Sequence, residues 1–532
     1  MDPLIYRYPS RRSVVYGQRG MVCTSQPLAA QAGLEILKQG GNAVDAAIAT
    51  AIAMTVMEPV SCGVGGDAFA LVWMKNKLYG LNASGPAPKG VSAEELRAAG
   101  NETVPLRGWA PVTVPGQPSG WIKLSRRFGK LPFAVLFGPA IRYAREGHPV
   151  APVISWQWSN QYRLFSKFTD PCFAHWGETF APKGRAPLAG EIWGSPALAR
   201  TLEELAQSEC ESFYRGPLAA KIDAFSRQTG GWLRAEDLAE YHAQWVEPIS
   251  VRYKGYDVWE IPPNGHGLVV LMALNILRND TFAYRDNAEA YHRQIEAMKL
   301  AFADGQQYIA DPASMSQSVE SLLAPSYADA RRRTIADTAA MPQAGDPSSG
   351  GTIYLCTADG DGNMVSYIQS NYKGFGSGVV IPDTGIALHD RGANFNLTPT
   401  HPNCLAPGKK PYHTIIPGFL SKNGNAVGPF GVMGAFMQPQ GQAQVVMNTV
   451  DFHLNPQEAL DAPRWQWVGG MNIEVERGFP YAITEELVRK GHTIRVAPDS
   501  LSFGRGQIIW CNDQGVLMGA TDPRADGSVA AW

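Results

Sequence analysis

The stretch Asp346–Gly378, DPSSGGTIYLCTADGDGNMVSYIQSNYKGFGSG, decides how the rest of the chain is interpreted. A strand pattern, TIYLCTA, begins at Thr352, and a second strand pattern, MVSYIQS, follows the turn sequence DGDGN at 359–363. Two apolar runs joined by a short turn rich in Gly and Asn predict a β-hairpin. The first strand of this hairpin therefore begins at a threonine that directly follows the glycine pair 350–351.

Thr352 is a candidate nucleophile. A threonine hydroxyl is weakly nucleophilic and needs an adjacent base. If the chain is cut before Thr352, the new α-amine has a pKa of roughly 7.7–8.0 and can accept the hydroxyl proton. Gly350 and Gly351 tolerate the distorted backbone that self-cleavage between Gly351 and Thr352 requires. The alternative is an ordinary strand-initiating threonine, which this stretch alone favours because Gly-Gly-Thr is a common sequence.

Motifs further along the chain favour Thr352 as a nucleophile over an ordinary strand-initiating threonine. FGSG at 375–378, KKPYHTIIPGF at 409–419 and GPFGVMGAF at 428–436 follow the hairpin in that order. Together with the hairpin, they resemble the small subunit of the γ-glutamyltranspeptidase family of N-terminal-nucleophile hydrolases. The upstream part of the chain is similar to the large subunit, so that the resemblance covers about residues 20–526. It implies an α+β fold, a four-layer αββα sandwich in which helices cover two packed antiparallel sheets.

The resemblance also implies a precursor that matures into two chains. Residues 1–351 would form the large subunit and residues 352–532 the small subunit, folded as one intertwined unit. The two would stay together as a heterodimer, either alone or paired into a larger assembly. We expect a flexible linker over about residues 313–351, because little apolar periodicity follows Tyr327. A flexible end before the scissile bond would let the new N-terminus separate.

Composition narrows the class of protein. A formal net charge of −2 over 532 residues does not favour nucleic-acid or acidic-membrane partners. The N-terminal sequence has no apolar run typical of a signal peptide, and no 18-residue uncharged apolar stretch occurs. The seven cysteines are scattered and lack CxxC spacing, which argues against a disulfide framework or zinc site. We expect a cytoplasmic enzyme that uses no metal and no organic cofactor.

The resemblance assigns the catalytic roles. Thr352 matches the nucleophile, and Ser370 matches a hydroxyl residue that hydrogen-bonds it. Gly434 and Ala435 match paired glycines whose main-chain N–H groups form the oxyanion hole. Because these donors belong to the backbone, alanine preserves the chemistry if the backbone angle allows it. The structural alternatives are a plain strand serine at 370 and a plain glycine turn at 434–435.

Two positions depart from the pattern that binds a γ-glutamyl group. In KLYGLNASGPAP, at 77–88, Ser84 stands where the transpeptidases have an arginine that holds the substrate α-carboxylate. A neutral hydroxyl does not replace a bidentate cation. Asn394 stands where the family has an aspartate that binds the substrate α-amine. Both departures argue against γ-glutamyl specificity.

Further departures indicate a different substrate. Arg391 falls at a family glutamine and places a new cation beside the hairpin. The other substrate-binding positions that differ from the family pattern are Tyr372, His413 and Thr414. Arg391 adds a positive charge that would bind an acid, whereas Asn394 removes the aspartate that would bind an α-amine. These two changes predict that the substrate is an acidic amide without an α-amino group. The alternative for Arg391 is a structural ion pair, for example with Asp390 or Asp383.

The favoured function is therefore hydrolysis of a small acidic amide, such as oxamate to oxalate and ammonia, a step of bacterial purine catabolism. A larger acyl group, as in cephalosporin or glutaryl acylases, is the first alternative. γ-Glutamyl hydrolysis or transfer, with glutathione as substrate, is the second. A non-catalytic binding protein that stays uncleaved is the least favoured, because Thr352 and its preceding glycines are intact.

Overall fold

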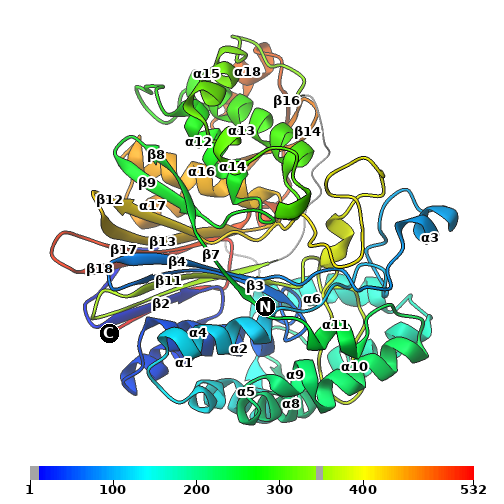
Figure 1. Ribbon diagram of the computed structural model, residues 1–532. Coiled ribbons are helices and arrows are strands. Elements are labelled where there is room, and N and C mark those ends of the chain that lie inside the picture. Colours follow the sequence, from blue (N-terminus) through cyan, green and yellow to red (C-terminus); the bar gives the residue numbers. More distant parts are fainter. Residues whose placement is uncertain (1–10, 343–351) are drawn as a thin grey trace.

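The computed structural model describes residues 11–342 and 352–532, and two seven-stranded sheets packed face to face form its centre (Figure 1). Neighbouring strands run antiparallel in both sheets. The first sheet has the order β1 (Val15–Gly17), β18 (Leu517–Thr521), β17 (Arg505–Cys511), β13 (Asn425–Met433), β12 (Gly418–Lys422), β9 (Tyr256–Glu260) and β8 (Ile249–Tyr253). The second has the order β19 (Ser528–Ala531), β2 (Gly20–Thr24), β10 (Ile353–Asp359), β11 (Met364–Ser370), β3 (Asp67–Met74), β4 (Lys77–Ala83) and β7 (Gln244–Val246).

Apolar side chains from the facing surfaces of the two sheets form a shared core. Phe69 and Ile368 of the second sheet belong to the same buried cluster as Phe419 and Ile509 of the first. Trp73 stacks on Phe419, with ring centroids 5.6 Å apart. Because successive strand residues point to opposite faces, each sheet also buries a second apolar face, which helices cover.

Helices form the two outer layers (Figure 1). The second sheet is covered by α1 (Pro27–Lys38), α2 (Ala43–Met57) and α4 (Gln117–Phe128). The first sheet is covered by α12 (Gly267–Leu277), α16 (Met437–Val450) and α17 (Pro456–Asp461), and α13 (Ala288–Tyr308) packs on α12. The predicted four-layer αββα sandwich is therefore confirmed.

Smaller elements surround these layers. The remaining α-helices are α3 (Ala93–Ala98), α5 (Gly138–Glu146), α6 (Pro152–Phe165), α7 (Ala174–Phe180), α8 (Pro196–Gln207), α9 (Glu211–Arg215), α10 (Pro217–Gln228), α11 (Ala235–Ala239), α14 (Val319–Leu322), α15 (Pro325–Arg333) and α18 (Tyr481–Arg489), as far as residues 11–342 and 352–532 are concerned. The strands outside the two large sheets are β5 (His148–Pro149), β6 (Ile192–Trp193), β14 (Trp465–Gly469), β15 (Asn472–Val475) and β16 (Thr493–Val496).

Helix α2 lies directly against the β10–β11 hairpin, which follows the candidate nucleophile Thr352. The side chain of Asn42 caps it by accepting hydrogen bonds from the N–H groups of Val44 and Asp45, both at 3.0 Å. Every residue of α2 is buried, and its side chains are mostly small and apolar. A helix that is apolar on all sides is buried on all sides, and α2 accordingly contacts β10, β11, α1 and α5.

The predicted hairpin is confirmed as β10 and β11, with Ile353 opposite Gln369. Thr352 immediately precedes β10 and Ser370 ends β11, so the two residues meet at the open end of the hairpin. Strand β3 pairs with the other edge of β11 and places Asp67 opposite Ser370. Three polar side chains from distant parts of the sequence therefore share one end of the second sheet.

The segment expected to be a linker contains regular structure in its first part. Beside a 3-10 turn at Pro312–Ser314, α14 and α15 lie within it, and α15 packs against α12 and α13. Apolar periodicity is weak there because the helices are short and only Leu322 and Ala328 are buried. Residues 343–351, and with them Gly351 of the predicted cleavage site, lie outside the described part of the chain.

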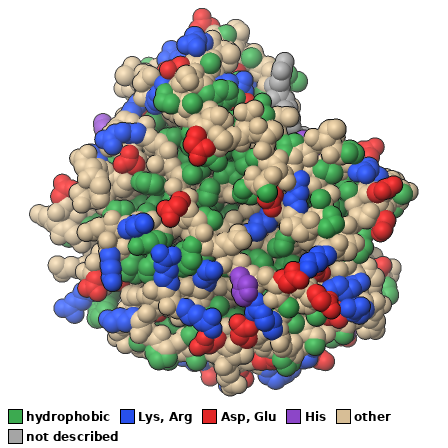
Figure 2. Space-filling model, viewed as in Figure 1, with side chains coloured by type: hydrophobic (Ala, Val, Ile, Leu, Met, Phe, Trp, Pro, Cys, Tyr) green, Lys and Arg blue, Asp and Glu red, His purple; other side chains and the backbone are tan. Residues whose placement is uncertain are grey.

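On the side drawn in Figure 2, the surface has no large patch of one charge, because Lys and Arg side chains are interspersed with Asp and Glu. This distribution agrees with the formal net charge of −2. None of the helices within residues 11–342 and 352–532 combines the length and the apolar character needed to cross a membrane.

Candidate active site

The hydroxyl of Thr352 lies in a buried hydrogen-bonded group. Its Oγ1 atom is 3.1 Å from Ser370 Oγ, and Gln438 Nε2 donates to it at 3.4 Å. Ser370 Oγ also accepts a hydrogen bond from the N–H of Tyr372 at 2.7 Å. Because the Tyr372 amide occupies one lone pair of Ser370, the serine hydroxyl is oriented relative to the threonine hydroxyl. Ser370 is therefore placed within hydrogen-bonding distance of Thr352, and its catalytic role stays a prediction.

Gln438 is a contact that the sequence analysis missed. It is the second residue of α16, and its Oε1 accepts a hydrogen bond from the N–H of Ile416 at 3.0 Å. The amide is therefore held in place at one end while its Nε2 reaches Thr352. Because α16 carries four glutamines, at 438, 440, 442 and 444, the sequence gives no signal that distinguishes Gln438 from a structural residue.

The candidate oxyanion donors lie in the turn between β13 and α16. Gly434 has a φ of +137° and Ala435 a φ of +48°, and their carbonyl groups accept the N–H groups of Met437 and Gln438 at 2.9 and 3.0 Å. This backbone geometry allows alanine at 435, although the left-handed conformation costs a residue with a Cβ roughly 1–2 kcal/mol. Space also favours glycine at 434, since a Cβ there would lie 3.1 Å from the Cα of Gly504, which is a tight contact.

Arg391 is fully buried beside the hairpin. Its Nη1 donates to Thr414 Oγ1 at 2.6 Å, and its guanidinium carbon lies 4.6 Å from the centroid of the Tyr372 ring. Its Nε and Nη2 atoms have no hydrogen-bond partner among the described residues. Burial lowers the pKa of Arg391 to about 10, so the side chain remains a cation near neutral pH.

The structural ion pair considered for Arg391 does not form within the described residues. Asp390 pairs instead with Arg107, at 2.8 Å, and accepts the N–H of Lys373 at 2.9 Å. Asp383 is exposed, whereas Arg391 is buried. The guanidinium therefore keeps part of its hydrogen-bonding capacity for another group.

Asp67 is a buried acid whose charge interacts with that of Arg391, and it is a second residue that the sequence analysis missed. One carboxylate oxygen lies 3.0 Å from His413 Nε2, and the other accepts the N–H of Gly116 at 3.0 Å and lies 3.9 Å from His389 Nε2. Burial raises the pKa of Asp67 to about 7, even though the nearby charge of Arg391 opposes this rise. Burial lowers the pKa of His413 well below its usual value. Near neutral pH, Asp67 is therefore the group of this cluster that titrates.

The two positions that depart from the γ-glutamyl pattern offer neutral groups. Ser84 is buried and donates to Asn82 Oδ1 at 2.7 Å, with Asn264 Oδ1 3.4 Å away. Asn394 is half-buried, and its carbonyl group accepts a hydrogen bond from Asn403 Nδ2 at 2.6 Å. The Nδ2 atom of Asn394 has no partner among the described residues.

The structure thus brings most of the predicted site residues together through direct contacts. They form a connected series: Thr352, Ser370, Tyr372, Arg391 and Thr414, with His413 next in sequence. Gly434 and Ala435 join this series through α16 and Gln438. Asn394 is connected to it only by the 3-10 turn Arg391–Asn394. A candidate nucleophile, candidate backbone donors and a buried cation in one place would suit hydrolysis of an acid-bearing amide or acyl compound.

Comparisons with known proteins agree on the family but not on the substrate. A family model described as gamma-glutamyltranspeptidase matches residues 29–532. The chain is 36% identical to the oxamate amidohydrolase proenzyme of Klebsiella pneumoniae, covering 96% of this chain and 98% of the relative. It is 34% identical to the glutathione hydrolase-like YwrD proenzyme of Bacillus subtilis, covering 97% and 98%. Among solved structures, a cephalosporin acylase from Bacillus halodurans is 59% identical, with a TM-score of 0.97 and coverage of 100% and 99%.

Proposed function

Since the chain belongs to the gamma-glutamyltranspeptidase family, we propose that it is a self-cleaving N-terminal-nucleophile hydrolase of a small acidic amide. Cleavage before Thr352 would separate residues 1–351 from residues 352–532, which stay together as two subunits. Relatives named as proenzymes support such processing. Oxamate is the compound we propose first. A cytoplasmic location of the enzyme and a place for this reaction in purine breakdown are predictions from the sequence.

The chemistry follows from the groups around Thr352. After cleavage, the α-amine of Thr352 takes the proton of its own hydroxyl, and the oxygen attacks the substrate carbonyl carbon. The main-chain N–H groups of Gly434 and Ala435 stabilise the oxyanion. The protonated α-amine returns its proton to the leaving nitrogen, which departs as ammonia. Water, deprotonated by the same amine, then attacks the ester on Thr352 and releases the acid.

One observation supports a small acid as the substrate. Arg391 is buried, charged and close to the nucleophile hairpin, yet two of its guanidinium nitrogens lack partners among the described residues. Buried guanidinium donors without hydrogen-bond partners are costly, and a carboxylate that accepts two parallel hydrogen bonds is the group that fits a guanidinium. Tyr372, stacked on the guanidinium, limits the space beside it. Oxamate carries its carboxylate directly next to the scissile carbonyl, within reach of a site this close to Thr352.

A longer acyl group is the second candidate. It is favoured by the 59% identity to a protein named as a cephalosporin acylase. A γ-glutamyl substrate is disfavoured because it carries both an α-carboxylate and an α-amine. Ser84 and Asn394 offer no charge for either group, and losing one buried charge-assisted pair typically costs about 2–5 kcal/mol.

A substrate series distinguishes these candidates. The cleaved protein is assayed with oxamate, succinamate, a glutaryl amide and a γ-glutamyl anilide. We expect kcat/KM to fall as the carboxylate moves away from the scissile carbonyl, and γ-glutamyl turnover to be weak. Arg126→Lys, a change at an exposed arginine that pairs with Glu209, serves as the control for purification and folding. A preference for the glutaryl amide would replace the small-acid proposal with the acylase candidate.

A further inference from the structure

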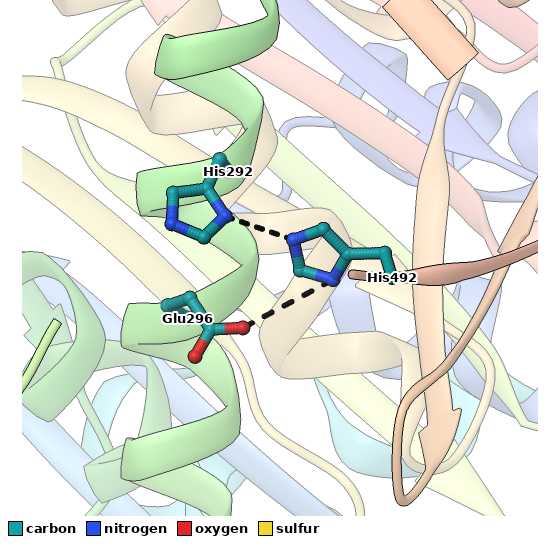
Figure 3. A group of neighbouring side chains, drawn as sticks. All are labelled: His292, Glu296 and His492. Carbon is teal, nitrogen blue, oxygen red and sulfur yellow. Dashed lines mark hydrogen bonds and ion pairs between the residues drawn. The ribbon is translucent and has the colours of Figure 1, made fainter. Parts of the chain in front are cut away.

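A second group of buried polar side chains lies in the helical layer, on α13 (Figure 3). His292, Glu296 and Lys299 are spaced four and three residues apart and share one face of the helix. His492, which follows α18, approaches them from the C-terminal part of the chain. Its Nε2 lies 2.9 Å from His292 Nδ1, and its Nδ1 lies 4.0 Å from Glu296 Oε1. All four side chains are buried.

Two histidines and a glutamate suggest a metal site, since their ligand atoms lie within 4.8 Å of one another. Lys299 argues against this interpretation. Its Nζ lies 2.7 Å from Glu296 Oε1, and its side chain is only 1% exposed. The carboxylate is therefore already paired with a buried ammonium, which would repel a divalent cation held by Glu296.

The group instead holds main-chain atoms of residues 336–340. His292 Nε2 lies 2.9 Å from the carbonyl oxygen of Ala336. At Ala340, the N–H donates to Glu296 Oε2 at 3.2 Å, and the carbonyl oxygen accepts from Lys299 Nζ at 2.5 Å. The buried Glu296–Lys299 pair thus binds both the N–H and the carbonyl group of Ala340. Each charge strengthens one of these two hydrogen bonds.

The C-terminal part of the chain contacts the same five residues from the other side. Lys490 accepts the N–H of Ala339 with its carbonyl oxygen at 2.6 Å, and its Nζ donates to the carbonyl oxygen of Asp337 at 3.1 Å. Lys490 Nζ also binds Glu289 Oε2 of α13 at 2.7 Å. Residues 336–340 therefore lie between α13 and residues 490–492, held through backbone atoms on both sides.

These contacts join parts of the chain that lie on opposite sides of the proposed cleavage site. Residues 336–340 lie upstream of the proposed cleavage site, and α13 belongs to the same future subunit. Residues 490–492 belong to the other future subunit. A grip on main-chain atoms does not depend on the side chains of the segment, three of which belong to alanines. It fixes the path of the chain close to residue 342, where the described segment that precedes Thr352 ends.

We propose that His292, Glu296, Lys299, Lys490 and His492 form a main-chain clamp that positions the precursor for self-cleavage before Thr352. The clamp anchors residues 336–340, which precede Thr352 in the sequence, between α13 and residues 490–492. These side chains are positioning residues, because they contact neither Thr352 nor any other member of the candidate active site among the described residues. The inference rests on the proposed self-cleaving function, and it states that self-cleavage requires the clamp.

The test follows the cleavage of newly made full-length chain in a cell-free synthesis and chase. In the double variant Glu296→Gln/Lys299→Met, both buried charges are removed together, so that neither is left unpaired. We expect this variant to cleave at least about tenfold more slowly than wild type, because the charged partners of Ala340 are lost. Ala340→Pro removes the N–H that Glu296 accepts and should slow cleavage without any change to the buried pair. Thr338→Pro is its matched control, since no hydrogen bond from the Thr338 N–H to a described residue occurs.

Two further measurements separate positioning from general stability. The fraction that does cleave should hydrolyse substrate with the kcat/KM of wild type, and the melting temperature of the double variant should stay close to that of wild type. Cleavage of both variants within twofold of the wild-type rate would overturn the clamp. So would a variant whose cleaved fraction is equally impaired, or a stoichiometric metal that purified wild type retains through His292 and His492. If wild type itself does not cleave, the proposed function fails instead.

Discussion

The hydroxyl oxygens of Thr352 and Ser370 lie 3.1 Å apart at the open end of the β10–β11 hairpin. Ser370 is in turn fixed by the N–H of Tyr372. We expect Ser370→Ala to slow both self-cleavage and substrate hydrolysis by about 10- to 100-fold, the usual loss for one buried hydrogen bond to a reacting group. Rates of cleavage and of steady-state turnover measure the effect.

A matched control lies on the same strand. Ser366 bonds the hydroxyl of Tyr354 in the core at 2.7 Å, four residues before Ser370. Ser366→Ala should lower stability while leaving the cleaved enzyme active. Equal losses of activity in the two variants would mean that Ser370 acts through the core and not on the nucleophile.

Arg391 provides the test of substrate recognition. Arg391→Ala should lose roughly 2–5 kcal/mol of transition-state stabilisation for oxamate, measured as kcat/KM, and should still cleave itself. Arg391→Lys should also lose much of the activity, because an ammonium does not reproduce the paired donors of the guanidinium. Oxamate hydrolysis that is unchanged in Arg391→Ala would show that the carboxylate binds elsewhere.

Asp67 should make substrate binding depend on pH. Its pKa is raised to about 7 by burial, so it is neutral below this pH and a carboxylate above it. The ionised form competes with an acidic substrate for the charge of Arg391. We therefore expect the KM for oxamate to rise as the pH rises through about 7, and to rise less in Asp67→Asn, where Asp390, whose pKa is also raised to about 7 by burial, still titrates.

The same group affects stability in a direction that can be measured. In the unfolded chain an aspartate has a pKa of about 3.9, so between about pH 4 and 7 the folded state binds more protons. The free energy of unfolding should therefore fall as the pH rises across this window. Asp67→Asn should remove that part of the decline, and denaturant unfolding at pH 4.5 and 7.5 gives the comparison. An unchanged pH slope in the variant would contradict the assignment.

Ala435 offers a test of the oxyanion turn. Its φ of +48° is easily adopted by glycine, and the N–H that would hold the oxyanion belongs to the backbone. Ala435→Gly should therefore keep hydrolysis within about threefold of wild type, since the donor is retained. Ala435→Val, with a β-branched side chain at the same angle, should lose stability and activity. Initial rates and melting curves of both variants test this; a glycine variant without activity would contradict the proposed role of the turn.

Local sequence patterns predicted the parts of the fold that depend on local geometry. The hairpin followed from two apolar runs around DGDGN, and the structure places Thr352 and Ser370 at its open end, as expected. The linker was less predictable, because short helices such as α14 and α15 bury too few residues to give a periodic pattern. The four-layer arrangement came from the resemblance to a family and not from periodicity.

The missed residues share a physical cause. Asp67 reaches the site because β3 pairs with β11, and Gln438 reaches it because α16 starts beside the hairpin. His292 contacts His492, which lies 200 residues away in the sequence. Contacts of this kind arise from tertiary packing, so the spacing of residues within a short stretch of sequence does not predict them.

The most direct test of the central claim is N-terminal sequencing of the smaller chain of purified protein, combined with the activity of Thr352→Ala. The account predicts that the smaller chain begins TIYLC, that Thr352→Ala remains a single intact chain, and that this intact chain has no hydrolase activity. Wild-type protein that is fully active as one uncut chain would contradict it, because Thr352 would then have no free α-amine to act as the base.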